Sequence, residues 1–444
     1  MDASSQPPSL PVPLPETALR ADPGPSFLKR TVFAPVKFLA GLLMVQSPLG
    51  AVMLTGWTSR LMQRVVLWTW WRAAKDRPKS FAEFVATENA TAGHVHWPNW
   101  ILDQSFSSKV SAEPPLSQKL RRFITGLFLS LWENGRLGSQ MVLNTSLVLL
   151  PSMLLMWTGW FSGWQVSFNK QYEHVAVGAS VSLIGIVLFV AAMFYAPLAL
   201  ARQASTGDWR RFYDFKLVRG LVKRAWFGNV LVAGGHAAAS LPVIAMMVGP
   251  TFFAQGNTRA TELSPAVVEQ NLRLYYLVCA LWVFPAFVLL RCATAYLYGR
   301  TVLKAVQSGA LGEDDLAENE WHSFRRLGLL DDVVPAKRSL WTELVLWFGT
   351  KAGRITAGFM VAGLWFLVVG QISYVATFFS YRFAFSWINQ PLIFLPWFMH
   401  LPAHIEDQWG PVGVAFLVLF AAWRIQRLVK WVQAKKAALA RSDA

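Results

Sequence analysis

The chain has 444 residues, of which 54% are hydrophobic and only 15% charged, and its mean hydropathy is +0.36. Soluble domains carry charge on about a quarter of their residues, so this composition excludes a set of ordinary soluble domains. The net charge of +16 raises the possibility of a nucleic-acid partner, but the basic residues flank apolar stretches and form no continuous stripe, so we predict membrane lipids with anionic headgroups as partners and no nucleic acid.

Residues 1–26 are polar and proline-rich and contain no apolar core of a signal peptide. We predict a disordered cytoplasmic tail. The next domain, 27–140, is predicted to hold an apolar hairpin and a cytoplasmic interfacial region.

The first apolar stretch, 33–57, is long enough to cross a bilayer but carries Gln46, Ser47, Pro48 and Gly50 at its midpoint. Proline removes a backbone donor and breaks a helix at this point. Basic residues flank the stretch on both sides, which favours a hairpin with both flanks in the cytoplasm over a seventh crossing.

Two helices at the headgroup level are predicted after this hairpin. Residues 60–75 are basic and aromatic, so Trp68, Trp70 and Trp71 are expected to anchor them in the interface. Residues 121–136 repeat apolar side chains at helical spacing and end at Asn134-Gly135, a plausible helix C-cap.

Six later segments approach or exceed the roughly 20 apolar residues that a membrane-spanning helix needs. The predicted fold is therefore an all-α, polytopic bundle of six spans: 141–164, 175–201, 226–254, 274–298, 355–379 and 410–429. The corresponding domains are a four-span bundle at 141–300, a cytoplasmic loop at 301–354, a two-span hairpin at 355–429 and a basic tail at 430–444.

The basic residues predict the orientation of these spans. The connections 59–140, 202–225 and 299–354 and the tail from Arg424 hold 11, 7, 8 and 6 of them, whereas the three opposite connections hold four in total. Because cytoplasmic loops carry the excess of Lys and Arg, the C-terminus is predicted to be cytoplasmic, with the protein in the cytoplasmic, or inner, membrane.

The loop after the fourth span contains amphipathic helices. Between residues 313 and 330, Leu316, Trp321, Phe324 and Leu327 share one helical face. Residues 339–354 form a second such pattern, typical of an interfacial helix that leads into the fifth span.

A weak internal echo relates residues 193–207 to 295–309. Arg202 pairs with Lys304 and Gly207 with Gly309 at one offset. Duplication of this kind occurs in transporters built from repeats, and chance similarity between two cytoplasmic helix ends explains it equally well.

Arg291 is the one basic residue inside the first five predicted spans, the sixth having Arg424 and Arg427 near its C-terminal end, and none of the 25 acidic residues lies in a span. A charge within the membrane is a functional hypothesis by default, so Arg291 is a candidate contact for an anion or a lipid headgroup. The alternative is that its long side chain snorkels to the nearby cytoplasmic interface.

His236 lies among small residues in the third span and is a candidate for a polar contact with a neighbouring helix. No second buried histidine pairs with it for haem. His400 and His404 offer metal-ligand chemistry, but Pro402 disfavours the helix that would align them. We therefore predict no cofactor and no metal.

No motif of a catalytic nucleophile, phosphate-binding loop or metalloprotease occurs in a suitable context, so no catalytic residue is predicted. Small residues instead recur at helical spacing where helices could pack closely in lipid. The pairs are Gly178 with Ser182, Ala233 with Ala237, Gly235 with Ala239, and Gly358 with Ala362.

Four short motifs appear in order along residues 33–300: Gly56-Trp57 with Arg60, the W-P-N-W of 97–100, Leu150-Pro151, and Y-A-P-L-A-L-A-R-Q-A at 195–204. In these the chain resembles an uncharacterised family of prokaryotic multi-pass membrane proteins, from which it departs by an extra C-terminal pair of spans. The resemblance implies a bacterial membrane protein and transfers no catalytic residue.

Two functions fit these observations. The first is a non-enzymatic scaffold, assembly or regulatory component of the cytoplasmic membrane, with a protein partner or a second copy of itself. The alternative is a transporter or permease for an anionic or amphipathic solute or a lipid. A polar cavity reaching Arg291 would favour transport, and a solid apolar bundle the scaffold.

Overall fold

The computed structural model describes six stretches of the chain and two single positions: residues 27–75, 80–92, 116–159, 175–256, 264–330 and 351–368 except 366, with 392 and 396. Within these ranges every regular element is a helix and there is no strand. The prediction of an all-α fold is therefore confirmed for the described part. The predictions for residues 1–26, for the 97–100 motif, for His400 and His404, and for the sixth span lie outside it.

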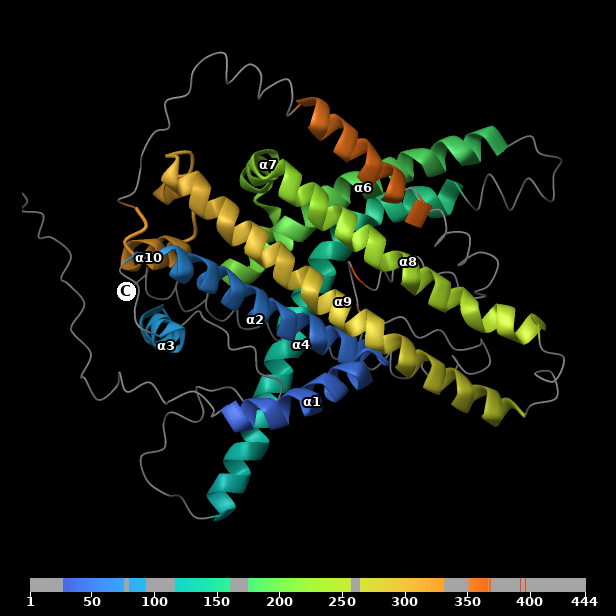
Figure 1. Cartoon of the computed structure of the whole chain (residues 1–444), viewed down its shortest axis with the longest axis horizontal. Helices are drawn as coiled ribbons and strands as arrows, with labels where there is room; N and C mark the ends of the chain where they lie inside the picture. The colour runs from blue at the N-terminus through green and yellow to red at the C-terminus, as the bar shows by residue number, and fades with distance from the viewer. Residues whose placement is uncertain are drawn as a thin grey trace, which may run out of the picture.

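Three described helices are long and apolar enough to cross a membrane. They are α4 (Leu116–Gly159) over Ile124–Met156, α6 (Val175–Thr206) over Ser180–Thr206, and α9 (Pro265–Gln307) over Ala266–Gln307. The helix α8 (Trp226–Gly256) has 31 residues and packs along α9 (Figure 1). Helical residues 351–368 contain the start of the fifth predicted span.

The first apolar stretch folds as a helical hairpin. Three residues separate helix α1 (Phe27–Met44) from α2 (Pro48–Ala73), which begins with Pro48 as its first residue. The Ser47 hydroxyl caps α2 by accepting from Gly50 N at 3.1 Å. Figure 1 shows the two arms opening toward the same end of the molecule, where α10 (Glu318–Arg326) lies. The predicted break at Pro48 is confirmed.

The second arm corrects the interfacial helix predicted at 60–75. Those residues continue α2 into the core instead of lying on lipid, and Met62, Val66 and Leu67 are buried. Trp70 is also buried, with its ring centre 4.7 Å from that of Phe324, and donates from Nε1 to Gly299 O at 2.9 Å. Trp70, predicted as an anchor in the headgroup region, contacts α9 and α10 instead.

The predicted C-cap at Asn134-Gly135 is wrong, because α4 runs without interruption through it for 44 residues. Asn134 is buried where α4 crosses α2. A methyl group on Gly56 would collide with the Asn134 carbonyl oxygen, and one on Gly138 would collide with Val52 O. The two backbones therefore touch through glycines, which is the usual way that helices approach closely in lipid.

Small residues also bring α4 against α6. A methyl group on Gly159 would meet Gly178 O at 2.7 Å and the Ser182 side chain. The predicted close approach at Gly178 and Ser182 is thus confirmed.

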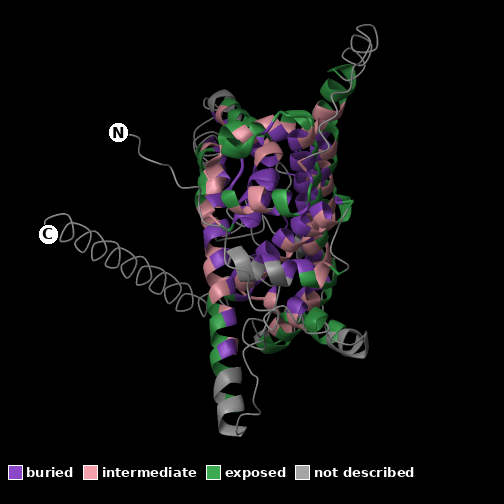
Figure 2. Ribbon diagram, turned by 90° about the vertical axis from the view of Figure 1, so that its left-hand side faces the viewer, coloured by how far each residue is buried: buried purple, intermediate pink, exposed green. Residues whose placement is uncertain are grey.

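Short elements cover one end of the bundle, toward which the C-termini of α2, α6 and α9 point (Figure 1). Figure 2 views the molecule from that side and shows buried segments gathered inside a rim of exposed turns. The elements are α3 (Phe81–Ala92), η4 (Trp209–Tyr213), α7 (Phe215–Arg224), η6 (Glu313–Asp315) and α10 (Glu318–Arg326). The apolar face predicted for 313–330 is confirmed, since Leu316, Phe324 and Leu327 are buried.

Of the residues matched between 193–207 and 295–309, the two glycines have similar backbone conformations in the structure, and the two basic residues differ in burial. Gly207 directly follows α6 and Gly309 lies two residues after the end of α9, with φ of 72° and 67°, a conformation that favours glycine and ends each helix. Arg202, however, is fully buried and Lys304 is exposed. The two segments therefore end their helices in the same way, with a glycine of positive φ, and they do not form a common site.

Candidate functional site

The two residues singled out within the spans lie on neighbouring helices. His236 of α8 and Arg291 of α9 are both buried, at 4% and 3% exposure, and are close enough for their charges to interact. The Arg291 guanidinium lies 5.0 Å from the centre of the Phe287 ring. Helix α9 continues for sixteen residues beyond Arg291, and both interpretations of this residue, an anion or lipid contact and snorkelling, stay predictions.

His236 makes its hydrogen bond within its own helix, with Nδ1 2.8 Å from Val232 O. The predicted polar contact with a neighbouring helix stays a prediction, and Arg291 of α9 is close enough to be its partner. Neither residue lines the groove described below. The pair is buried among packed helices.

A second polar cluster lies at the covered end of the bundle and centres on Arg202. This guanidinium, 0% exposed, forms an ion pair with Glu320 of α10, which is 1% exposed. Its Nε donates to Asp214 at 3.2 Å, Nη1 to the Tyr298 hydroxyl at 3.1 Å, and Nη2 to Asp315 O at 3.2 Å. One arginine thus joins α6, the N-cap residue of α7, α9, the last residue of η6, and α10.

Glu320 is held on its other oxygen as well. The hydroxyls of Ser205 and Tyr298 donate to Oε1 at 2.6 and 2.8 Å. Asn319 beside it donates to Ser205 O at 3.2 Å. We name Arg202, Ser205, Asp214, Tyr298 and Glu320 the buried clamp.

Glu88 extends the connection to α3. This carboxylate is 2% exposed and accepts from Ser323 Oγ at 3.0 Å and from Arg326 Nη1 at 2.9 Å, both on α10. Helix α10 is therefore fixed to the bundle on one side and holds α3 on the other.

A third set of bonds fixes the η4 turn. Asn144 of α4 donates to Gln203 Oε1 at 3.0 Å and to Trp209 O at 2.8 Å, and it accepts from the Tyr213 hydroxyl at 3.1 Å. Burial raises the pKa of Tyr213, so its phenol remains a donor at neutral pH.

The donors and acceptors of the buried clamp are directed at one another. Buried charges are stable only when they are paired and hydrogen-bonded, and here both conditions hold. The arrangement fixes the position of segments that are distant in sequence, which is a structural action. Removal of one charged partner of the clamp would leave an unpaired charge in the core.

Glu320 was not predicted as a site residue from the sequence, and Arg202 appeared there only as half of an internal repeat. One signal could have found the carboxylate, since Glu320 lies four residues after Leu316 and four before Phe324, on the apolar face of α10. An acidic residue at such a position needs a buried cation as partner.

The chain matches no protein family, no curated protein and no solved structure. The resemblance to an uncharacterised membrane family therefore stays a prediction, and function rests on the geometry above.

Proposed function

We propose that the protein is a six-span component of the cytoplasmic membrane that acts as a non-enzymatic scaffold, assembly or regulatory protein. Its working surface is the cytoplasmic end, which the buried clamp holds as a rigid platform. The observation that carries this proposal is the Arg202–Glu320 ion pair, because it ties a loop segment to a membrane-spanning helix without a solvent-exposed partner.

The convergence of three connections supports the orientation. Residues from 59–140, 202–225 and 299–354, which carry most of the basic residues, meet at one end through Glu88, Asp214 and Glu320. The hairpin of α1 and α2 opens toward that same end, in keeping with a cytoplasmic N-terminus (Figure 1).

Reporter fusions test this topology. Fusions after Ser205, Ser308 and Ala444 are expected to report the cytoplasm, and fusions near Asn169, Asn257 and Asp407 the opposite side, because the excess of basic residues stays inside. The measurement is the activity of paired reporters that are each active on one side only. A reproducible inversion at one of these positions contradicts six spans in this orientation.

Affinity purification tests the scaffold function. With a tag at Ala444 in mild detergent, the wild type is expected to retain a protein partner, or a second copy carrying a different tag. The Glu320→Gln variant, compared with the wild type at equal membrane abundance, is expected to lose this partner or second copy, because the platform is no longer fixed. Glu313→Gln is the control, because its ion pair with Arg325 is 59% exposed on both sides. Equal retention by Glu320→Gln and wild type would count against the platform.

Transport of an anionic or amphipathic solute is the second candidate, and the buried pair of Arg291 and His236 favours it. In the described residues this pair lies between packed helices, which supports the scaffold more strongly. If the Arg291→Leu variant loses solute uptake at normal membrane abundance, transport becomes the better supported function and the scaffold the second.

A further inference from the structure

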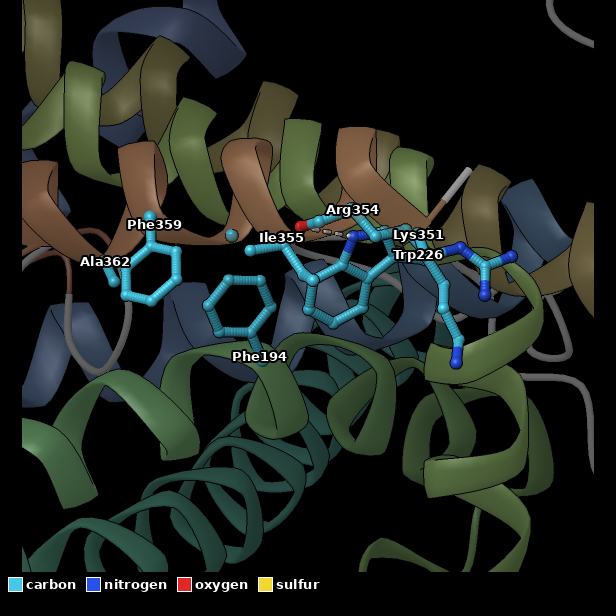
Figure 3. Close-up of a pocket in the computed structure, with 8 residues that line it drawn as sticks. Phe194, Trp226, Lys351, Arg354, Ile355, Phe359 and Ala362 are labelled. Atoms are coloured by element: carbon cyan, nitrogen blue, oxygen red, sulfur yellow. Dashed lines mark hydrogen bonds between the residues drawn. The ribbon is translucent and has the colours of Figure 1, made fainter. Parts of the chain in front are cut away.

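A groove of about 630 Å³ runs along the outside of the bundle between α6, α8 and residues 351–362 (Figure 3). Phe194 and Trp226 form one wall, and Ile355, Gly358, Phe359 and Ala362 the other. Lys351 and Arg354 complete the lining. In Figure 3 these two basic side chains lie beside Trp226 at one end, and Phe359 and Ala362 lie at the other.

The apolar walls are fixed by specific contacts. Phe194 and Trp226 stack in parallel with ring centres 5.4 Å apart. Trp226 Nε1 donates to Arg354 O at 3.2 Å. Gly358 lies against the same indole, where a methyl group would be 3.2 Å from the ring. The groove therefore keeps its shape without an occupant.

The polar end is strongly positive. Lys351 and Arg354 are exposed, and α7 ends two residues before Trp226 with Lys223 and Arg224, which are exposed as well. Neither 215–230 nor 351–365 contains an acidic residue. The described residues of α6, α8 and 351–365 thus contribute no negative charge to this end of the groove, and its positive charge favours an anion.

The length of the groove fits one leaflet of a bilayer. Eleven residues separate Lys351 from Ala362, about 16 Å of helix, and half of the hydrocarbon core measures about 15 Å. The basic end also belongs to the side that the charge distribution assigns to the cytoplasm, where anionic lipids concentrate.

We propose that this groove is a binding site for one anionic glycerophospholipid of the cytoplasmic leaflet. An acyl chain lies along Phe194, Trp226 and Phe359, and the phosphate pairs with Lys351 and Arg354. The site is separate from the buried clamp, so it holds whether or not the scaffold function does.

Native mass spectrometry of the full chain in mild detergent tests the site. With phosphatidylglycerol, the wild type is expected to keep one lipid more tightly than with phosphatidylcholine. The double variant Lys351→Gln/Arg354→Gln is expected to lower the affinity on the order of tenfold or more, from two lost charge contacts. The matched control is Arg300→Gln/Lys304→Gln, two exposed basic residues of α9 outside the groove. Equal losses in both double variants overturn the site.

The apolar end has its own pair of variants. Ala362→Phe fills the groove and is expected to weaken binding, whereas Met360→Phe, at a 72% exposed position outside it, is not. A photoreactive benzoylphenylalanine in place of Phe359 is expected to crosslink phosphatidylglycerol. A crosslink to another part of the chain, to a second copy or to another protein instead means that a polypeptide occupies the groove and overturns the proposal.

Discussion

Replacing Gly56 by alanine is expected to destabilise the protein by about 3 kcal/mol or more, at or above the upper end of overpacking costs. The new methyl group would collide with Asn134 O and lie 2.8 Å from Gly138 N, so backbone meets backbone and no side chain can move aside. Gly138→Ala is expected to have a similar effect, since its methyl group meets Val52 O. The measurement is the midpoint of thermal unfolding in detergent.

Gly135 provides the control on the same helix. An added methyl group there has nothing within 4 Å, and alanine favours a helix over glycine by about 1 kcal/mol. Gly135→Ala is therefore expected to raise the midpoint or leave it unchanged. Equal midpoints for Gly56→Ala and Gly135→Ala would show that α2 and α4 do not touch at this crossing.

Breaking the buried clamp is expected to cost about 3–5 kcal/mol, the usual loss when one partner of a buried ion pair is removed. Glu320→Gln keeps the shape of the side chain but leaves Arg202, which is 0% exposed, with only the partly exposed Asp214 as a counter-charge. The exposed pair of Arg325 and Glu313 supplies the comparison, and Glu313→Gln is expected to cost about 0–1 kcal/mol. Both values come from unfolding midpoints of purified protein.

A double variant separates charge from shape. Arg202→Met combined with Glu320→Leu removes both charges and fills similar volumes, so it is expected to recover much of the stability that Glu320→Gln loses. Stability as low as in the single variant would mean that the hydrogen bonds from Tyr298 and Ser205, and not the charges, hold α10.

The sequence predicted the helical class and the break at Pro48 because these depend on local rules. Apolar length signals a span, and proline after a capping serine begins a new helix. The close approach at Gly178 and Ser182 was also predictable, since small residues at helical spacing mark helix contacts in lipid.

The prediction for residues 60–75 failed for a physical reason. A basic, aromatic helix suits the headgroup region and a protein core equally well when its partners carry matching groups. Here Trp70 donates a hydrogen bond to Gly299 O and packs against the Phe324 ring, and both residues lie more than 220 positions away in sequence. Periodicity gives the apolar face of a helix but not what covers it.

The buried clamp could not be predicted from the sequence, for the same reason. Arg202 belongs to a basic helix end and Glu320 to an amphipathic helix, and each pattern alone is typical of a solvated residue. Only the folding of the 299–354 connection onto the end of α6 brings them together.

Hydrogen exchange at the backbone amides of α10 tests the rigid platform most directly. In the wild type, the amides around Glu320, Ser323 and Phe324 are expected to exchange slowly, because these residues are buried and bound to the bundle. In Glu320→Gln a loss of about 3 kcal/mol predicts exchange faster by about a hundredfold, whereas the loss of about 0–1 kcal/mol in Glu313→Gln predicts a change of at most about fivefold. Exchange in the wild type as fast as in an unfolded chain, or at the same rate in Glu320→Gln, would contradict a platform held by the clamp.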